Sequence, residues 1–452
     1  MPQAVPGWYG QDARRRIWVE LTRPAGFAAG PACPMHHIGP APTSLRTISP
    51  SSKQNRFHLT MNRSSTPMRP AAKITLLAAG PALGISIARF AYGLLLPAMK
   101  DEFGWSYSEA GWINTSNAVG YILGALTASI AVRRLGAAVT YGAGAAVTVL
   151  ALFCLGHSDD FIVLNMLRLV SGVSGAWIFV AGGVIATAVA SEQPESSAVL
   201  IGIFYAGAGF GIVLSGALVP PWLDLFGQAA WREAWLLLGA LGFLLAAMGC
   251  LAAKAAADGR PMSVGGGAYR IARDRWILGG YAAFGAGSMG YMTFVVSYLA
   301  SRAVGHAQIS AFWIVIGLSS MSAPWLWSRL LSRQRHARAF AVLVSVCGIG
   351  SVIPLFSTNV PAVMISAAVF GSAFFAVVAA TTDFVRRNVE PDGRATAVGA
   401  FTVAFGVGQM VGPFAVGAVA DSHSSLIAGL AASSLLIALG ATLSLPQRDR
   451  RS

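Results

Sequence analysis

Residues 194–211 read PESSAVLIGIFYAGAGFG, and 197 positions later residues 391–408 read PDGRATAVGAFTVAFGVG. Six of the eighteen aligned positions are identical. The identical pairs are Pro194/Pro391, Ala198/Ala395, Gly202/Gly399, Phe204/Phe401, Gly209/Gly406 and Gly211/Gly408. A weaker echo, at an offset of 201, aligns Ala110 and Trp112 with Ala311 and Trp313. Repetition at a fixed offset predicts a chain built from two related halves.

Apolar runs surround both copies of the repeat. From residue 72 onward, runs of about 19 to 25 residues alternate with short polar breaks, and a helix needs roughly 20 apolar residues to cross a bilayer. The twelve runs are 74–98, 110–131, 137–156, 161–188, 197–220, 232–253, 276–299, 308–330, 339–357, 361–382, 395–419 and 425–445. In lipid, only a helix satisfies its backbone groups within one segment. The sequence therefore predicts an all-α, polytopic membrane protein with two six-helix bundles.

The overall composition agrees with this prediction. Of the 452 residues, 55% are hydrophobic and 11% are charged, whereas an average soluble domain has roughly 25% charged residues. The formal net charge is +14, which in a soluble protein would suggest a nucleic-acid partner. Here the basic residues lie in separate loops, so a lipid bilayer is the predicted partner and nucleic acid is not.

The basic residues also predict the orientation. If the N-terminus is cytoplasmic, the cytoplasmic loops and C-terminal tail contain seventeen Lys and Arg residues, and the outer loops contain three, Lys100, Arg232 and Arg302. Because cytoplasmic loops are enriched in Lys and Arg, both termini are predicted to lie in the cytoplasm of a bacterial cell whose inner membrane the chain spans.

The longest internal break divides the predicted halves. Residues 254–275 form a basic, Gly-rich linker between an N-terminal bundle (72–253) and a C-terminal bundle (276–446), and a short C-tail follows at 447–452. Residues 1–70 have no apolar run long enough for a span or a signal peptide. They are interpreted as a disordered tail or as an upstream extension of the reading frame, with Met61 or Met68 as the start.

Enzymatic and metal chemistry find little support in the sequence. The four cysteines form no CxxC pair and no His/Cys cluster, so neither a disulfide nor a zinc site is predicted. A metal role for Cys33, His36 and His37 is the weak alternative. No GxxxxGK[ST] loop is present for nucleotide binding, and no nucleophile has a His partner. The prediction is a protein that is not an enzyme and needs no cofactor.

With twelve runs, a basic central linker and a repeat between halves, residues 72–446 resemble the major facilitator superfamily (MFS). Within it, ARFAYGLLLPAM and GWINTSNAVGYILGAL are similar to the bacterial YbfB/YjiJ-type branch. The resemblance implies two pseudo-symmetric bundles around a central cavity that opens alternately to each side of the membrane.

The short motifs of the superfamily fit unevenly. RLVSGVSGA supplies the expected Arg168, Gly172, Gly175 and Ala176 in the fourth span, whereas VRRLGA keeps Arg134 and Gly136 but has Arg133 where Asp is expected. The latch that this Asp serves elsewhere in the family is therefore in doubt. A glycine motif that ends in Gly-Pro is incomplete in span five, where Gly211 is followed by Ser215 and Gly216. Its full form is in span eleven, with Gly399, Gly408, Gly412 and Pro413. These glycines are interpreted as close-packing and hinge positions.

The stretch GISIARFAYGLLLPAM, residues 84–99, places an arginine inside the first run. Arg89 precedes Pro97 by eight residues, or about 12 Å along a helix, which is too far for its side chain to reach the headgroups comfortably. An arginine there costs about 2.5–3.5 kcal/mol on insertion scales. Its side chain should therefore face protein or a water-filled cavity.

Other polar residues are expected to surround Arg89. The candidate binding residues on spans one, two and four are Ser86, Tyr92, Asn114, Asn117, Tyr121 and Arg168. Four further candidates, for binding or for packing alone, are Trp177, Tyr281, Tyr291 and Gln409. A structural alternative remains open, in which Arg89 pairs with helix-end carbonyls or with Glu109 and Arg168 pins span four to span one.

The acidic residues bear on the substrate. All eighteen lie in the tail, in loops or near a span end, and a guanidinium without a buried counter-ion suits an anion, which it can bind through paired hydrogen bonds. Proton coupling usually needs a titratable group inside the membrane. Coupling would here use boundary groups such as Glu109 or Asp383, or the ionisation of the substrate itself.

The resulting hypothesis is a monomeric secondary transporter of a small organic anion such as a carboxylate. The residues assigned to coupling or gating are Glu109, Arg134, Gly172, Gly211, Asp383, Gly408, Gly412 and Pro413. One alternative is an efflux antiporter for drugs or metabolites, against which the missing intramembrane carboxylate counts. A second is a receptor or scaffold on the same fold that does not transport.

Overall fold

The structure, a computed structural model, describes residues 68–256, 269–333 and 337–448. The predicted tail up to residue 67 and the central part of the predicted linker lie outside the described residues. Within the described ranges, helix is the only regular secondary structure. The prediction of an all-α protein is confirmed.

The N-terminal half begins with a composite helix. It consists of α1 (Pro70–Leu77), α2 (Ala79–Pro81), the π-helix η1 (Ala82–Phe90) and α3 (Tyr92–Phe103). Five long helices follow, with one short 3₁₀ turn among them. They are α4 (Tyr107–Leu135), α5 (Ala137–Leu155), α6 (Phe161–Ser191), α7 (Ser197–Phe226), η2 (Gln228–Ala230) and α8 (Trp231–Ala255).

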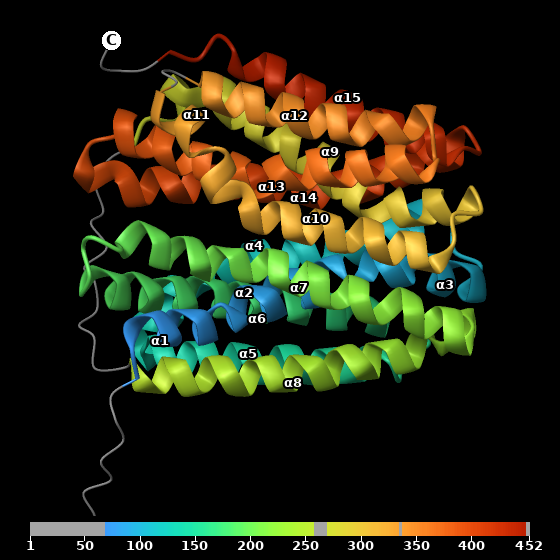
Figure 1. The fold of residues 1–452 in the computed structure, drawn as a ribbon, viewed down its shortest axis with the longest axis horizontal. Helices are drawn as coiled ribbons and strands as arrows, with labels where there is room; N and C mark the ends of the chain where they lie inside the picture. Colours follow the sequence, from blue (N-terminus) through green and yellow to red (C-terminus); the bar gives the residue numbers. More distant parts are fainter. Residues whose placement is uncertain (1–67, 257–268, 334–336, 449–452) are drawn as a thin grey trace, which may run out of the picture. The chain divides into compact units, whose positions relative to one another are not determined.

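The C-terminal half repeats this plan. Its elements are η3 (Ile271–Asp274), α9 (Arg275–Ser301), α10 (His306–Leu326), α11 (Ser328–Arg333), α12 (Arg338–Phe356), α13 (Val360–Asn388), η4 (Pro391–Gly393), α14 (Arg394–Ser422) and α15 (Leu426–Ser444). Figure 1 shows both halves, with the first in blue to green and the second in yellow to red.

All twelve predicted runs fall on helices. Eleven helices in the described part of the chain are long and apolar enough to cross a membrane. The remaining one, α9, is 27 residues long, and glycine, serine and tyrosine interrupt its apolar character. Several helices extend beyond the predicted runs because polar residues cap them. At Ser106 and Glu109, a capping box starts α4 three residues before the apolar run at Ala110.

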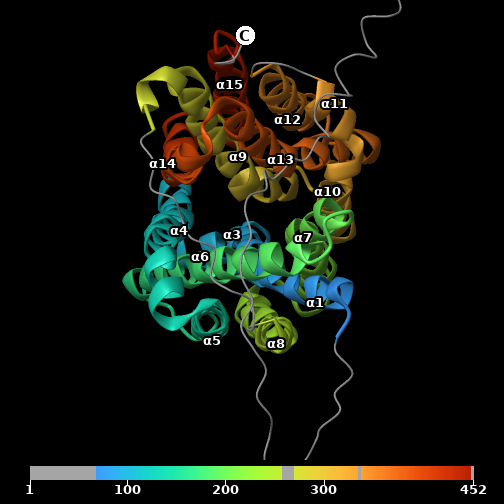
Figure 2. The ribbon, with the colours of Figure 1, turned by 90° about the vertical axis from the view of Figure 1, so that its left-hand side faces the viewer.

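The helices of each half pack against one another, and three helix pairs form the main contact between the halves. In the first half, α6 lies against α4 and α5, and α5 lies against α8; in the second half, α15 lies against α9 and α12. Across the halves, α14 packs on α4, α10 packs on α7, and α3 packs on α9. Figure 2 shows the same division, with α4 below α14 and α7 beside α10.

The sequence repeat is also a structural repeat. The helices α7 and α14 begin at Ser197 and Arg394, which are 197 residues apart like the two copies of the repeat. A Cβ on Gly209 would lie 2.6 Å from Met321 Cγ of α10, and one on Gly406 would lie 2.6 Å from Ile122 Cγ1 of α4. The paired glycines therefore allow both helices to approach the other half closely.

The composite first helix was not predicted, because the run at 74–98 reads as one continuous α-helix. The structure instead has a π-helix from Ala82 to Phe90, and at its end the Ala91 N–H donates to the Ser86 carbonyl, five residues back. π-Helical turns inside α-helices occur frequently at functional sites. Here the segment contains Arg89.

Candidate functional site

Arg89 lies at the contact between the two halves. Its side chain is 3% exposed, and its Nη2 donates a hydrogen bond to Gln409 Oε1 of α14 at 3.0 Å. Its Nε is buried without a hydrogen-bond partner among the described residues. The Tyr121 ring of α4 lies beneath the guanidinium, with its centroid 5.2 Å from Cζ. The structure thus brings together three predicted residues from three helices.

Arg168 is also buried, but its hydrogen bonds go to other groups. From α6, its Nη1 and Nη2 donate to the main-chain carbonyls of Ala88 and Arg89, and Nη2 also donates to Asn114 Oδ1 at 2.8 Å. The two carbonyls lie where the π-helix changes into α3, so the guanidinium binds the backbone at a junction between two helix types. This arrangement favours the interpretation in which Arg168 pins span four to span one.

Several other candidates use their polar groups to join helices. The Tyr92 hydroxyl donates to the Ala110 carbonyl at 2.8 Å, and Ser86 donates to the Ala208 carbonyl of α7. Asn117 Nδ2 donates to the Arg168 carbonyl and to Ser171 Oγ, both at 3.0 Å. These side chains are therefore not directed at the Arg89 guanidinium.

Asn114 connects the halves as well as the arginines. Its Oδ1 accepts from Arg168, and its Nδ2 donates to Thr293 Oγ1 of α9 at 2.7 Å. Thr293 was not predicted as a site residue. No periodic pattern in the sequence marks it, because its relevance comes from the packing of the second half against α4.

The three remaining aromatic candidates lie in different environments. Trp177 Nε1 donates to Thr127 Oγ1 of α4 at 3.0 Å. The Tyr291 hydroxyl lies 3.1 Å from Ser366 Oγ inside the second half, which is a packing position. Tyr281 stacks on Phe405, with ring centroids 4.5 Å apart and planes at 10°.

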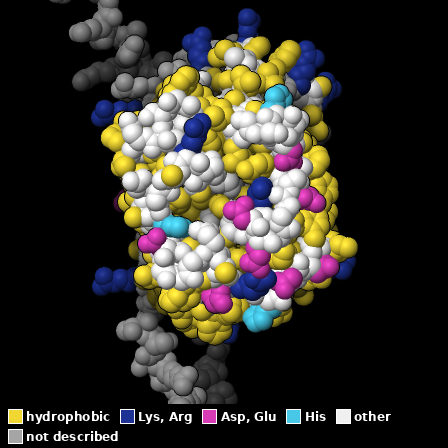
Figure 3. Space-filling view, turned by 90° about the vertical axis from the view of Figure 1, so that its right-hand side faces the viewer, with side chains coloured by type: hydrophobic (Ala, Val, Ile, Leu, Met, Phe, Trp, Pro, Cys, Tyr) yellow, Lys and Arg dark blue, Asp and Glu magenta, His cyan; other side chains and the backbone are white. Residues whose placement is uncertain are grey.

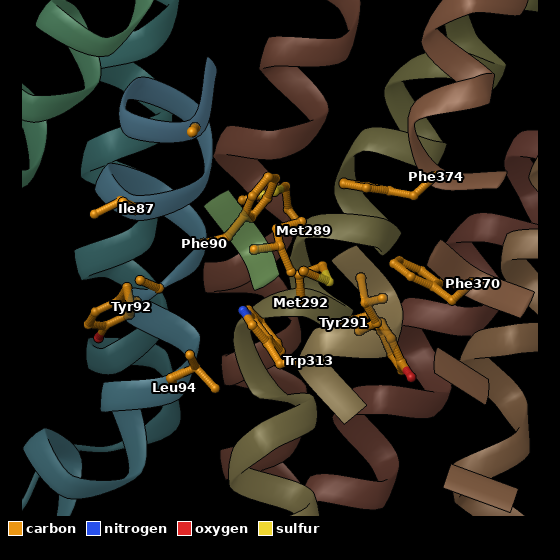
Figure 4. Close-up of a cluster of buried hydrophobic side chains, with 14 of the residues drawn as sticks. Ile87, Phe90, Tyr92, Leu94, Met289, Tyr291, Met292, Trp313, Phe370 and Phe374 are labelled. Carbon is orange, nitrogen blue, oxygen red and sulfur yellow. The ribbon is translucent and has the colours of Figure 1, made fainter. Parts of the chain in front are cut away.

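Figure 4 shows the apolar contacts of Phe90, the residue that follows Arg89 in the chain. Phe90 points from the first half toward Met289 and Phe374 of the second half. Its ring centroid is 5.7 Å from that of Phe374, in an edge-to-face arrangement. Trp313 of α10 lies in the same cluster, and its Nε1 donates to Ser215 Oγ of α7 at 3.2 Å. Apolar packing therefore closes the interface next to the buried cation.

The predicted glycines lie at close helix contacts. A Cβ on Gly211 would be 2.5 Å from the Ala82 carbonyl oxygen. The same addition at Gly172, Gly408 or Gly412 would overlap a main-chain carbonyl of the helix opposite. The Pro413 carbonyl itself lies against Gly111 of α4. These positions tie α6 to α4 and α14 to α9 and α4, as expected for packing glycines.

The predicted coupling residues at the boundaries have local partners. Glu109 closes the capping box of α4, because its Oε2 accepts from Ser106 N at 2.8 Å, so it does not pair with Arg89. Asp383 forms ion pairs with Arg386 and Arg387 on its own helix. Arg134 lies exposed in the last turn of α4.

Asp421 is a residue that the sequence interpretation missed. It lies near the C-terminal end of α14, where its two carboxylate oxygens accept hydrogen bonds from the Tyr107 and Ser108 N–H groups at 2.8 Å each. Those N–H groups begin α4 in the other half. The carboxylate thus joins the halves at the end of the bundle that carries the predicted outer loops, called the predicted outer end from here on.

A family model and a bacterial relative each match most of this chain. Residues 81–445 match the family model described as "Uncharacterised MFS-type transporter YbfB". The inner membrane transport protein YdhP of Escherichia coli O157:H7 is 27% identical over 379 residues, which cover 77% of this chain and 92% of YdhP.

Solved transporter structures share the fold. A bacterial homologue of the human lysosomal transporter Spinster, in an inward-facing and unoccupied conformation, superposes with a TM-score of 0.65 at 15% identity, covering 85% of this chain and all of that one. The nucleoside transporter NupG superposes with a TM-score of 0.62 at 14% identity, covering 84% of this chain and 98% of NupG. At such low identity these two likenesses show the fold alone.

Proposed function

Because this chain belongs to the YbfB-type family of MFS transporters, we propose that it moves a small organic anion, such as a carboxylate, across the bacterial inner membrane by alternating access. The inner-membrane assignment follows the relative YdhP, whose name describes an inner membrane transport protein. The protein would act as a monomer in the bilayer, as a secondary transporter.

The observation that carries the anion proposal is that the buried Arg89 guanidinium has no counter-charge and only part of its hydrogen bonds. Its guanidinium is buried, yet it has one neutral partner, Gln409, and Nε has none among the described residues. A buried charge without a counter-charge is costly. No carboxylate is buried within the membrane-spanning helices of the described chain, since the one fully buried acid, Asp274, precedes α9. An anionic substrate would supply the missing charge and hydrogen-bond acceptors.

The same argument disfavours cationic drugs as substrates. A cation would meet Arg89 without a carboxylate to offset the repulsion. A neutral solute such as a nucleoside would find hydrogen-bonding groups in Gln409 and Tyr121 but would leave the Arg89 charge without a counter-charge, so uridine serves as the neutral comparison.

The structure supports coupling through the ionisation of the substrate. Glu109 is exposed and caps α4, so it is not a proton relay beside Arg89. A carboxylic acid that enters with its proton, or a carboxylate that moves together with one, needs no buried titratable side chain.

The charge distribution supports both termini in the cytoplasm. Figure 3 shows acidic side chains gathered on the predicted outer end. The acids that belong to this end are Asp101, Glu102, Glu109, Asp159, Asp160, Asp224, Glu233 and Asp421, against the three cations Lys100, Arg232 and Arg302. The positive-inside rule counts Lys and Arg, and it is the three cations at this end against seventeen in the opposite loops and tail that agree with it.

Substitution of Arg89 tests the proposal. In membrane vesicles, Arg89→Gln should abolish uptake or exchange of organic acids while the protein still inserts and remains monodisperse after purification. Arg89→Lys should retain a small part of the activity, because a lysine keeps the charge but lacks the planar fork. Wild-type rates in Arg89→Gln, or wild-type protein that transports uridine and no acid, would overturn the anion proposal.

A further inference from the structure

We propose that the substrate of the Arg89 site is a monovalent anion with a flat aromatic body. This inference rests on the proposed anion transport and specifies its substrate class. Three observations carry it: the engagement of the second buried cation, two tyrosines near the contact of Arg89 with Gln409, and the aromatic surface beside Gln409.

The site can neutralise one negative charge. Arg89 and Arg168 are the two buried cations of the described residues. Arg168 already donates to two main-chain carbonyls and to Asn114, so it cannot turn toward a substrate without releasing the π-helix junction. A dicarboxylate would therefore place its second charge in the interior without a partner, at a high cost.

Two tyrosines lie near the contact of Arg89 with Gln409. The Tyr121 ring of α4 lies under the Arg89 guanidinium, with its centroid 5.2 Å from Cζ. The Tyr281 ring of α9 stacks on Phe405 of α14, which precedes Gln409 by one helical turn.

An aromatic surface continues from these tyrosines into the second half. Phe405 lies one turn before Gln409 on α14, and its ring stacks on Tyr281 at 4.5 Å and on Phe284 at 6.0 Å. Phe405 is only partly buried. Gln409, which accepts the hydrogen bond of Arg89, therefore borders a surface of stacked rings.

These features match the two parts of an aromatic carboxylate, its charged group and its ring. A carboxylate would take the Nε and Nη donors of Arg89, and an attached ring would pack between Tyr121 and the ring pair of Tyr281 and Phe405. Each added aromatic pair strengthens binding about 2- to 10-fold. We therefore expect an aromatic acid to bind at least about tenfold more tightly than an aliphatic acid of similar size.

Thermal-shift titration of the purified full-length protein tests this inference. The probes are benzoate, cyclohexanecarboxylate, succinate, the neutral isostere benzamide and uridine. Benzoate should stabilise the protein at the lowest concentration, because a ligand stabilises the state that it binds. Benzamide and succinate should be at least tenfold weaker.

Variants of Tyr121 provide a matched control. Tyr121→Leu should remove most of the preference for benzoate over cyclohexanecarboxylate, whereas Tyr121→Phe should keep it, because the ring remains. Equal binding of all monocarboxylates, lost in Arg89→Gln, would overturn the aromatic class and leave the anion proposal standing. Binding of uridine or benzamide without any acid would overturn both.

A second inference comes from the predicted outer end. The geometry points to a pair of contacts related by the repeat, called the outer latches, that close this end and open together. Asp421 of α14 forms the first latch with the Tyr107 and Ser108 N–H groups of α4. Asp224 of α7 forms the second, because its Oδ1 lies 3.1 Å from Nδ1 of His306, the first residue of α10.

The repeat relates the two latches. Asp224 and Asp421 are 197 positions apart, the offset of the repeat in α7 and α14. Each acid lies near the C-terminal end of its helix, where the helix dipole disfavours a negative charge. Each is instead placed at the N-terminal end of a helix in the opposite half, where that charge is favoured. Opening of this end requires both contacts to break.

Amide hydrogen exchange of the full-length protein tests the paired opening. Asp421→Ala should raise exchange at residues 107–108, which lose their acceptor, and also several-fold at residues 306–309 of the other latch. Glu102→Gln is the matched control, because the Glu102–Arg232 ion pair of 2.6 Å lies at the same end but within one half. It should leave both segments unchanged.

The same measurement can refute the pairing. If Asp421→Ala raises exchange at residues 107–108 alone, the two contacts act independently and the proposal fails. Asp421→Asn keeps one acceptor oxygen and should give a smaller increase at both segments, which provides a milder variant if the alanine protein folds poorly.

Discussion

The same substitution at the two buried arginines should change the stability of the protein by very different amounts. Arg168→Gln removes donors from the Ala88 and Arg89 carbonyls and from Asn114 Oδ1. Hydrogen bonds to charged groups contribute about 1.5–3 kcal/mol each, so three bonds correspond to roughly 4.5–9 kcal/mol. Removing an arginine from a span returns about 2.5–3.5 kcal/mol on insertion scales. The net loss in the free energy of unfolding is then about 1–6.5 kcal/mol.

Arg89→Gln should change stability much less. It loses one hydrogen bond, to Gln409, of about 1.5–3 kcal/mol. The insertion cost that it relieves, about 2.5–3.5 kcal/mol, is of the same size. The two terms cancel approximately, so this variant should unfold near the wild-type temperature and yet fail to transport.

Thermal unfolding in detergent, followed by the loss of monodisperse protein, measures both effects. Arg168→Gln should lower the midpoint by about 5 °C, and Arg168→Lys should give an intermediate value because lysine keeps the charge without the fork. Equal destabilisation by Arg168→Gln and Arg89→Gln would refute the assignment of a structural role to one arginine and a binding role to the other.

Three further predictions follow from local contacts. Glu109→Gln should leave the pH dependence of transport unchanged, because Glu109 caps α4 through Ser106; a flattened pH profile would restore it as a coupling residue. Gly408→Leu should prevent accumulation of folded protein, because its Cβ would overlap a carbonyl of α9, whereas Gly399→Ala, with open space around it, should accumulate normally on immunoblots. Tyr92→Phe should lower stability by about 1 kcal/mol through loss of its hydroxyl contact, with little change in the KM for transport.

The sequence was sufficient for the twelve helices and for the family, because both depend on features that are local along the chain. Apolar runs, basic loops and the repeat at residues 194–211 each occur within one segment or at one fixed offset. The same information indicated that Arg89 is buried, since its depth follows from helix rise alone.

The partners of the arginines could not be predicted in the same way. Gln409 is 320 residues away from Arg89, and the sequence leaves it open between binding and packing because the contact depends on how the two halves meet. The π-helix also escaped prediction, because its sequence has the hydrophobicity of an ordinary span. The carbonyls of Ala88 and Arg89 at the end of the π-helix accept hydrogen bonds from Arg168. Whether Arg168 binds substrate or holds span four to span one therefore depends on backbone geometry that the sequence does not show.

The repeat nevertheless contains more information than its identical residues suggest. Extended beyond residue 211 at the same offset, it aligns Asp224 with Asp421, two acids whose sequence surroundings differ. Alternating access requires that neither open state be much more stable than the other. Contacts that close one end must therefore be strong enough to exclude solvent and weak enough to break in each cycle. A carboxylate at a helix N-terminus meets this condition, since such a contact contributes about 0.3–2 kcal/mol. With one such contact between α14 and α4 and another between α7 and α10, closure of this end depends on two weak contacts and not on a single strong one.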